Sequence, residues 1–404
     1  MVLDPDRGVA LSLSGEHHER EIRAVLDGLL DVYDGHDGRS FADLPPVDEF
    51  VVPDVGNATA TATTAALSFP AKVAAVGGEA SRTLLCVADT GHHQIIVAEV
   101  PSAGDDGCDT AAVMWVVGSG TDGLVDGRFG DAQFSSPQGL LIWAPEGFGS
   151  AVVFVADTGN NAVRRLDLAA QQVTTVWPVE GAPPLTADPA TGRPPPSLPW
   201  DLIAVGRRQG GADDGPDQIL IAMAGSHEIW ALDPSDGGAC RCVSGTGREA
   251  NLNHATDPLA ACWAQPSGLC LDADRGRVLV ADAESSSVRS LALGGGDGFG
   301  GVAAVAGGGS HEDDLFAFGF EDGSGQDAKF QHPLGLCSDG DGGFYVCDSF
   351  NDAIRCGVDG VGGGLLILWV VGCGLRVDVV VAGWRARARA CVCVCVCVCV
   401  MVFC

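Results

Sequence analysis

One polar pattern recurs along this chain at intervals of about 60 to 70 residues. In four of the five copies an apolar stretch ends in an aspartate, which Met223 replaces in the third copy, and in all five a polar residue follows four positions later. The acidic positions are Asp89, Asp157, Asp282 and Asp348, and the later positions are His93, Asn161, His227, Ser286 and Asp352. Carboxylate, imidazole and amide groups can bind ligands, and the first two also hold metal ions and transfer protons. A ring of these residues on one face could therefore bind a ligand or a metal.

The same pattern has a structural interpretation, which we favour. Asp and Asn side chains accept hydrogen bonds from nearby backbone N–H groups and tolerate left-handed turns. Each copy is self-contained, so each can cap its own turn without a ligand. We assign no catalytic residue. The candidate binding residues, all in these turns, are Asp89, His93, Asp157, Asn161, His227, Asp282 and Asp348.

Metal binding is the alternative for the histidines of these turns. Zinc needs side chains that converge at about 2.0–2.1 Å, whereas equivalent turns of different repeats lie far apart. The segment 322–330, DGSGQDAKF, is similar to a calcium loop but lacks its alternating oxygen ligands and final Glu. The sequence therefore predicts no metal and no cofactor. We expect Arg164, Arg165 and Arg289 to pair with acidic neighbours.

Further landmarks show what must position these turns. A proline precedes each copy by 15–24 residues, counted to the acidic position or to Met223, which replaces it in the third copy. In the fourth copy, four short alternating segments follow one another at 266–271, 277–281, 288–293 and 302–306. Four consecutive antiparallel strands form one propeller blade, and stacked blades bury each other's apolar faces. Five such units in tandem predict an all-β propeller.

The composition favours some classes of protein and argues against others. The 404 residues include 57 glycines and 46% hydrophobic residues, which favours a packed all-β protein rich in turns. The net charge of −30 argues against binding nucleic acid or an anionic membrane, because both are polyanionic. The 16 cysteines include no C-x-x-C pair, which favours a reducing compartment. The first residues lack an apolar signal segment.

The hairpins of the type ADTGNNAVR and the strand starts of the type P-x-G-L resemble the NHL repeat family. The resemblance extends over roughly 69–355 and implies a six-bladed propeller, of which about five blades are present. Within the family, the third unit with Met223 resembles that of proteins that join a thioredoxin-like domain to the propeller. No segment before Phe69 corresponds to such a domain, so the resemblance does not extend the redox function to this chain.

We divide the chain into four parts. Residues 1–33 form an N-terminal segment with a short amphipathic helix over 18–33, and 34–68 form a linker. Residues 69–374 form the propeller, with blades near 69–120, 132–178, 199–247, 263–309 and 330–374. Residues 375–404 form an aberrant low-complexity tail of Arg-Ala and Cys-Val repeats, which we interpret as mistranslated non-coding sequence. A cysteine-rich metal-binding tail is the alternative, because alternation places every Cys on one face of a strand.

The sequence favours a non-enzymatic interaction or scaffold module. Its expected partner is another protein or the missing thioredoxin-like domain, and self-association is expected through the unfinished blade edge. The alternative is a propeller enzyme, a metal-assisted hydrolase or lyase with His and Asp on one face, which would retain a stoichiometric divalent metal. An inactive product of a faulty gene model is a third interpretation. We expect a cytoplasmic location, or a chloroplast location if a targeting region is missing.

Overall fold

The structure is a computed structural model. It describes residues 2–3, 9–11, 67–77, 82–101, 112–144, 147–179, 192–206, 218–234, 238–294, 298–338, 343–359, 365–370, 379–381 and 384–386. Contacts divide the chain into two compact units, 1–66 and 67–404. In the first, β1 (Val2–Leu3) pairs antiparallel with β2 (Val9–Leu11). The expected helix over 18–33, residues 34–66 of the linker and the Cys-Val repeat lie outside the described residues.

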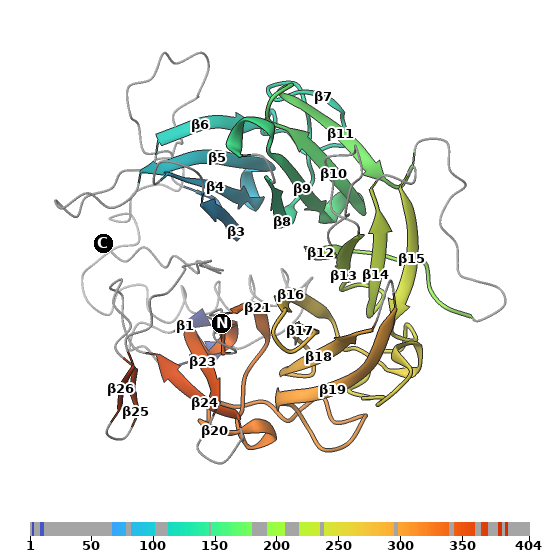
Figure 1. Cartoon of the computed structure of the whole chain (residues 1–404), viewed down its shortest axis with the longest axis vertical. Coiled ribbons are helices and arrows are strands. Elements are labelled where there is room, and N and C mark those ends of the chain that lie inside the picture. The colour runs from blue at the N-terminus through green and yellow to red at the C-terminus, as the bar shows by residue number, and fades with distance from the viewer. Residues whose placement is uncertain are drawn as a thin grey trace, which may run out of the picture. The chain divides into compact units, whose positions relative to one another are not determined.

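The second unit contains five sheets, each built from four consecutive antiparallel strands (Figure 1). We call these sheets blades one to five. Blade one contains β3 (Pro70–Gly77), β4 (Arg82–Asp89), β5 (Gln94–Pro101) and β6 (Ala112–Val117). Blade two contains β8 (Pro137–Trp143), β9 (Val152–Asp157), β10 (Ala162–Asp167) and β11 (Gln172–Trp177), with β7 (Gly127–Arg128) added at its outer edge.

The remaining blades repeat this order. Blade three contains β12 (Pro199–Val205), β13 (Gln218–Met223), β14 (Glu228–Asp233) and β15 (Ala239–Ser244). Blade four contains β16 (Pro266–Asp272), β17 (Arg277–Asp282), β18 (Ser287–Leu293) and β19 (Phe299–Gly307). Blade five contains β21 (Pro333–Ser338), β22 (Phe344–Asp348), β23 (Ala353–Asp359) and β24 (Leu365–Val370), with β20 (Gly323–Ser324) added to β24. The predicted all-β propeller is confirmed, with five blades.

The described helical elements are single turns of 3₁₀ helix, and none is long and apolar enough to cross a membrane. Three of them follow the second strand of a blade: η4 (Thr90–His92), η6 (Thr158–Asn160) and η9 (Ser349–Asn351). The others are η5 (Phe148–Ser150), η7 (Pro258–Ala260) and η8 (Gly325–Asp327). A further strand pair, β25 (Val379–Val381) with β26 (Trp384–Ala386), follows blade five in the chain.

The first strand of each blade lies toward the centre, and neighbouring first strands pack on one another from β3 through β8, β12 and β16 to β21. The glycine of the P-x-G-L start makes this approach possible. A Cβ on Gly139 would lie 2.6 Å from the Asp201 Cα, and one on Gly268 would lie 2.7 Å from the Leu334 carbonyl oxygen. Among the described residues, β21 and β3 show no comparable packing, so the blades form an open series.

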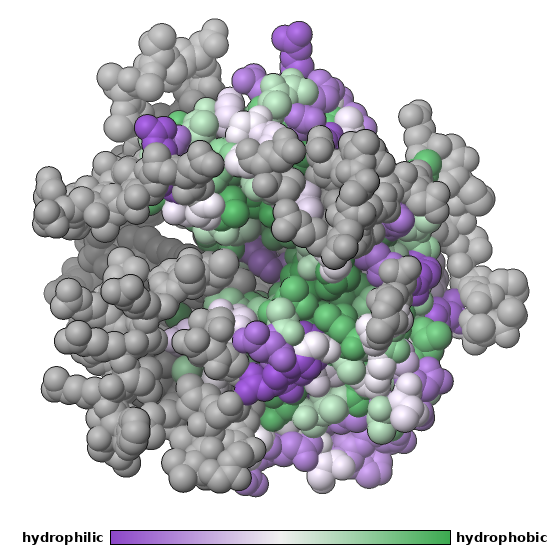
Figure 2. All heavy atoms as spheres, viewed as in Figure 1, coloured by the Kyte–Doolittle hydropathy of each residue, from purple (hydrophilic) through white to green (hydrophobic). Residues whose placement is uncertain are grey.

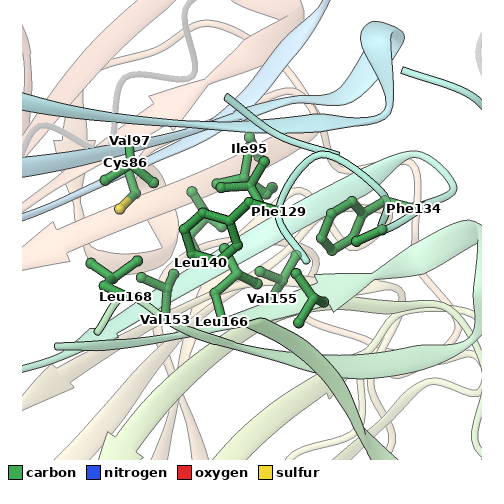
Figure 3. Packing of buried hydrophobic residues seen from close by; sticks show 14 of the residues in the cluster. Cys86, Ile95, Val97, Phe129, Phe134, Leu140, Val153, Val155, Leu166 and Leu168 are labelled. Atoms are coloured by element: carbon green, nitrogen blue, oxygen red, sulfur yellow. The ribbon is translucent and has the colours of Figure 1, made fainter. Parts of the chain in front are cut away.

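The core consists of apolar layers between adjacent blades. Between blades one and two, Cys86 and Val97 face Val153 and Leu166, with Phe129 of the connecting linker inserted between them (Figure 3). Corresponding clusters fill the next three interfaces. Figure 2 shows that strongly apolar residues of the described surface also gather near the middle of the viewed face. Each blade is thus held by burial against its neighbours.

Candidate functional site

The four repeated aspartates end the second strands of their blades, where they are almost completely buried. Asp157, Asp282 and Asp348 are 0% exposed and Asp89 is 3% exposed. In every case Oδ1 accepts a backbone N–H bond from just before the first strand of the same blade. The donors are Ser68, Ser135, Ala264 and Gln331, at 2.6–2.8 Å. Each aspartate therefore ties the turn to the start of its own blade.

The second carboxylate oxygen is also occupied by partners within the blade. It contacts the side chain three positions later, which is His92, Asn160, Ser285 or Asn351, at 2.8–2.9 Å. In blades two, four and five it also accepts a bond from the arginine seven positions later, Arg164, Arg289 or Arg355, at 2.8–2.9 Å. All three arginines are 0% exposed. Blade one has Ile96 at this position.

Each buried arginine connects three parts of its blade. Besides Asp157, Arg164 donates to the Val125 carbonyl oxygen and to Asp126 Oδ1, both at 2.8 Å. Its guanidinium also lies 5.0 Å from the centre of the Phe134 ring. The same arrangement holds for Arg289 over Trp263, at 4.5 Å. The prediction that Arg164 and Arg289 pair with acidic residues is confirmed, and Arg165 pairs with Asp167 at 3.1 Å.

The electrostatics of the aspartates follow from this burial. Desolvation raises the pKa of Asp157 and of Asp348, against the opposing effect of their hydrogen bonds and arginine partners. Enclosed carboxylates that already have several protein partners offer no open oxygen to a substrate. The structure therefore places Asp89, Asp157, Asp282 and Asp348 in separate internal networks.

The residues four positions later have a different role, because they reach forward to the next blade. All five adopt left-handed backbone, with φ between 49° and 56°. The side chains of His93, Asn161, His227 and Ser286 accept bonds from the backbone N–H groups of Ser136, Leu198, Gln265 and His332, at 2.6–3.5 Å. Each donor directly precedes the first proline of the following blade. We call these bonds the forward links.

Blade five carries the fifth residue of this type, Asp352, which is exposed. Its side chain has no partner among the described residues, and the structure describes no further blade after it. The matching N–H donor in blade one belongs to Phe69, which precedes Pro70, has φ 46° and is 86% exposed. The series of forward links therefore begins and ends with unpaired groups within the described chain.

Blade three replaces the aspartate with Met223 and obtains a carboxylate from another position. Glu228, which is 0% exposed, lies 3.0 Å from the Arg193 Nε atom and accepts a 2.8 Å bond from the Trp230 Nε1–H group. Burial raises the pKa of Glu228. Sequence reasoning missed Glu228 because it begins the next strand. The available signal was that it is the first acidic residue after Met223.

Replacing Glu228 by glutamine tests this buried acid. Because the folded-state pKa is raised, the carboxyl group favours folding below its unfolded-state pKa. That contribution disappears as the pH rises through the folded-state pKa, by about 1.4 kcal/mol for each unit of pKa difference. We expect the stability of the wild type relative to Glu228→Gln to fall over this range. Chemical denaturation at a series of pH values measures this difference in stability, with Glu99→Gln as a control for the loss of one charge. Plots of stability against pH that run parallel for the wild type and Glu228→Gln would contradict the prediction.

A second unpredicted ion pair joins three blades at the centre. Lys72 on β3 and Asp201 on β12 occupy the position that is glycine in the other three first strands. The Lys72 ammonium donates to Asp201 Oδ2, and the Leu269 N–H group on β16 donates to the same oxygen at 2.9 Å. Asp201 is 2% exposed. The sequence analysis missed this pair because the two residues are 129 positions apart. The available signal was that residues of opposite charge occupy a position that is glycine in the other blades.

The described residues contain no group of three or more His, Cys, Asp or Glu arranged to hold a metal ion. Cys86, Cys240, Cys242 and Cys262 are free thiols. Burial raises the pKa of Cys86, Cys240 and Cys242 to about 12, which keeps these thiols protonated at neutral pH. In the calcium-like segment, Asp322 pairs with Arg355 at 2.8 Å.

Comparisons with known proteins show sequence similarity to NHL repeat proteins. The NHL repeat model matches residues 264–289. NHL repeat-containing protein 2 of Gallus gallus is 37% identical over 303 residues, which cover 72% of this chain and 38% of that protein. The chloroplastic protein SUPPRESSOR OF QUENCHING 1 of Arabidopsis thaliana is 33% identical over 359 residues, covering 88% of this chain and 30% of that protein. The chain thus spans well under half the length of these relatives.

Among solved structures, an auxiliary nutrient binding protein from Bacteroides thetaiotaomicron is similar with a TM-score of 0.43 and 14% identity, over 75% of this chain and 70% of that one.

Proposed function

The chain carries an NHL-repeat β-propeller homologous to part of NHL repeat-containing protein 2, and from this premise we propose that it is a non-enzymatic scaffold that docks a protein partner. Where polar residues recur in every blade, they stabilise the blade or link it to the next. This arrangement suits a rigid support better than a reactive centre. Fold alone does not assign function, so the surface residues must carry the argument.

The observation that carries the proposal is a group of exposed phenylalanines at blade five. They are Phe316, Phe318, Phe320 and Phe350, whose exposed fractions are 81%, 51%, 50% and 43%. Large apolar side chains gathered on a water-facing surface are typical of protein interaction sites. The blade beneath them is held by the buried Arg355–Asp348 pair, so these rings extend from a fixed support.

We propose a thioredoxin-like domain as the partner, because the sequence resembles proteins that join such a domain to the propeller. The redox chemistry would then belong to the partner. A cytoplasmic location, with the chloroplast as the alternative, remains our proposal for the compartment. The chloroplastic name of the Arabidopsis relative is the reason for keeping the alternative.

Calorimetric titration of the purified chain with a thioredoxin-like domain from a relative tests this function. We expect saturable binding at one domain per chain, independent of added divalent metal. Parallel elemental analysis of the purified chain separates the enzyme alternative from the scaffold. A stoichiometric divalent metal together with absent domain binding would contradict the scaffold proposal and favour a metal-assisted hydrolase or lyase.

A further inference from the structure

The linker that enters blade five contains an insertion. In the linker that enters blade two, two residues, Thr121 and Asp122, follow Gly120. In the linker that enters blade four, two residues, Arg248 and Glu249, follow the equivalent Gly247. Before blade five, nine residues separate Gly309 from Gly319. The equivalence is set by contacts, because Asn160 donates to the Gly123 carbonyl oxygen as Asn351 donates to that of Gly319, both at 2.8 Å. Inserted surface loops often carry function.

The inserted segment presents aromatic rings at alternate positions. Phe316, Phe318 and Phe320, which we call the aromatic strip, are exposed, whereas Ala317 and Gly319 between them are only partly exposed. Alternation of this kind is expected of extended backbone, in which every second side chain points the same way. Gly319 anchors the strip, since its N–H group donates to the Phe330 carbonyl oxygen at 2.9 Å.

At Phe318 the backbone of the strip is open to a new partner. Residues 314–320 belong to none of the described strands. Within the described chain, neither the N–H nor the carbonyl group of Phe318 has a hydrogen-bond partner. An extended peptide can pair with such backbone while its side chains lie over the rings.

The surroundings of the strip are acidic. Residues 310–322 contain five carboxylates and no Lys or Arg. Arg248 pairs with Asp313 at 2.6 Å, and Arg355 pairs with Asp322 at 2.8 Å. Asp314 and Glu321, on either side of the strip, have no ion-pair partner among the described residues. Because the whole chain carries a net charge of −30, a second copy would be repelled and a cationic segment would be attracted.

From this combination we propose that the aromatic strip binds an extended, arginine- and lysine-bearing segment of a partner protein. The cationic groups lie over the faces of Phe316 and Phe318, where the ring quadrupole attracts them. The chain already uses this contact internally, because the Arg355 guanidinium lies 5.0 Å from the centre of the Phe320 ring. Asp314 and Glu321 flank the bound segment. This inference rests on the proposed scaffold function and names the chemistry of its docking surface.

A fluorescein-labelled peptide that alternates arginine with valine tests the proposal against a matched peptide with glutamate in place of arginine. Fluorescence anisotropy with the full chain is expected to show binding of the arginine peptide only, weakened at higher ionic strength. The double variant Phe316→Ser, Phe318→Ser is expected to weaken binding about tenfold, through lost cation–π contact and apolar area. Glu321→Gln is expected to weaken it about twofold to threefold.

The control removes two exposed apolar residues elsewhere. Val113→Ser, Met114→Ser changes side chains on β6 that are 61% and 41% exposed, and it is expected to bind like the wild type. The inference would be overturned if the two peptides bound equally, or if the arginine peptide bound the Phe316→Ser, Phe318→Ser variant as tightly as it binds the wild type. The scaffold function is separable from this result. If the thioredoxin-like domain still binds the aromatic variant in calorimetry, the scaffold stands and the strip is not its docking surface.

Discussion

Replacing Arg164 by methionine is expected to lower the free energy of unfolding by about 3–5 kcal/mol. The change keeps the apolar length of the side chain but leaves Asp157, which is 0% exposed, without its buried counter-charge. It also removes the bonds to the Val125 carbonyl oxygen and to Asp126, which are two of the attachments between the linker and blade two. Chemical denaturation of the purified variant measures the loss.

The adjacent residue supplies the control. The Arg165 side chain is 36% exposed, and its ion pair among the described residues is with the partly exposed Asp167, so Arg165→Met is expected to cost no more than about 1 kcal/mol. Adding Asp157→Leu to Arg164→Met removes the stranded charge and is expected to recover part of the stability. Equal losses for the two arginine variants would show that burial of the pair is not what stabilises the blade.

Replacing Lys72 by methionine is expected to cost about 3 kcal/mol. Asp201 would keep its bond from the Leu269 N–H group but lose the cation that neutralises it at the centre of the propeller. Because this pair joins blades one and three, its loss is also expected to increase the hydrogen exchange of β3. Exchange mass spectrometry reports that change, and denaturation reports the loss of stability.

The only other lysine provides the comparison. Lys329 contacts the Gly308 carbonyl oxygen at 3.4 Å and makes no ion pair with another described residue. Lys329→Met is therefore expected to change stability by less than about 1 kcal/mol. A similar loss for both lysine variants, or an unchanged β3 exchange rate in Lys72→Met, would contradict a joining role for the central pair.

The fold was predictable because its signals are local and repeated. Proline at each first strand, a polar turn after each second strand and glycine after the fourth strands of blades one, three and four follow from backbone rules that act within a few residues. Five tandem copies of this order of strands and turns are typical of a propeller. The pairing of Arg164 and Arg289 was predictable for the same reason, because both lie on third strands with acidic neighbours.

The partners of these turns were not predictable, because they depend on how blades pack. For Asn161 the sequence analysis weighed a ligand against the residue's own turn, whereas in the structure its side chain accepts a bond from the N–H group of Leu198, which is 37 residues away. Lys72 and Asp201 meet only because their strands lie near one centre. Glu228, at the start of the next strand, supplies the buried carboxylate that Met223 does not. In each case, side chains distant in sequence become neighbours only in the folded propeller.

The forward links all run the same way, from a turn in one blade to the N–H group at the start of the next. Their direction gives the described propeller two unlike ends: an acceptor at Asp352 and a donor at the Phe69 N–H group. A two-fold pair of copies can form this bond only reciprocally, with the acceptor of each copy facing the donor of the other. Copies joined head to tail by a single such bond keep one free end on each side, and this association grows with concentration into a filament unless it closes.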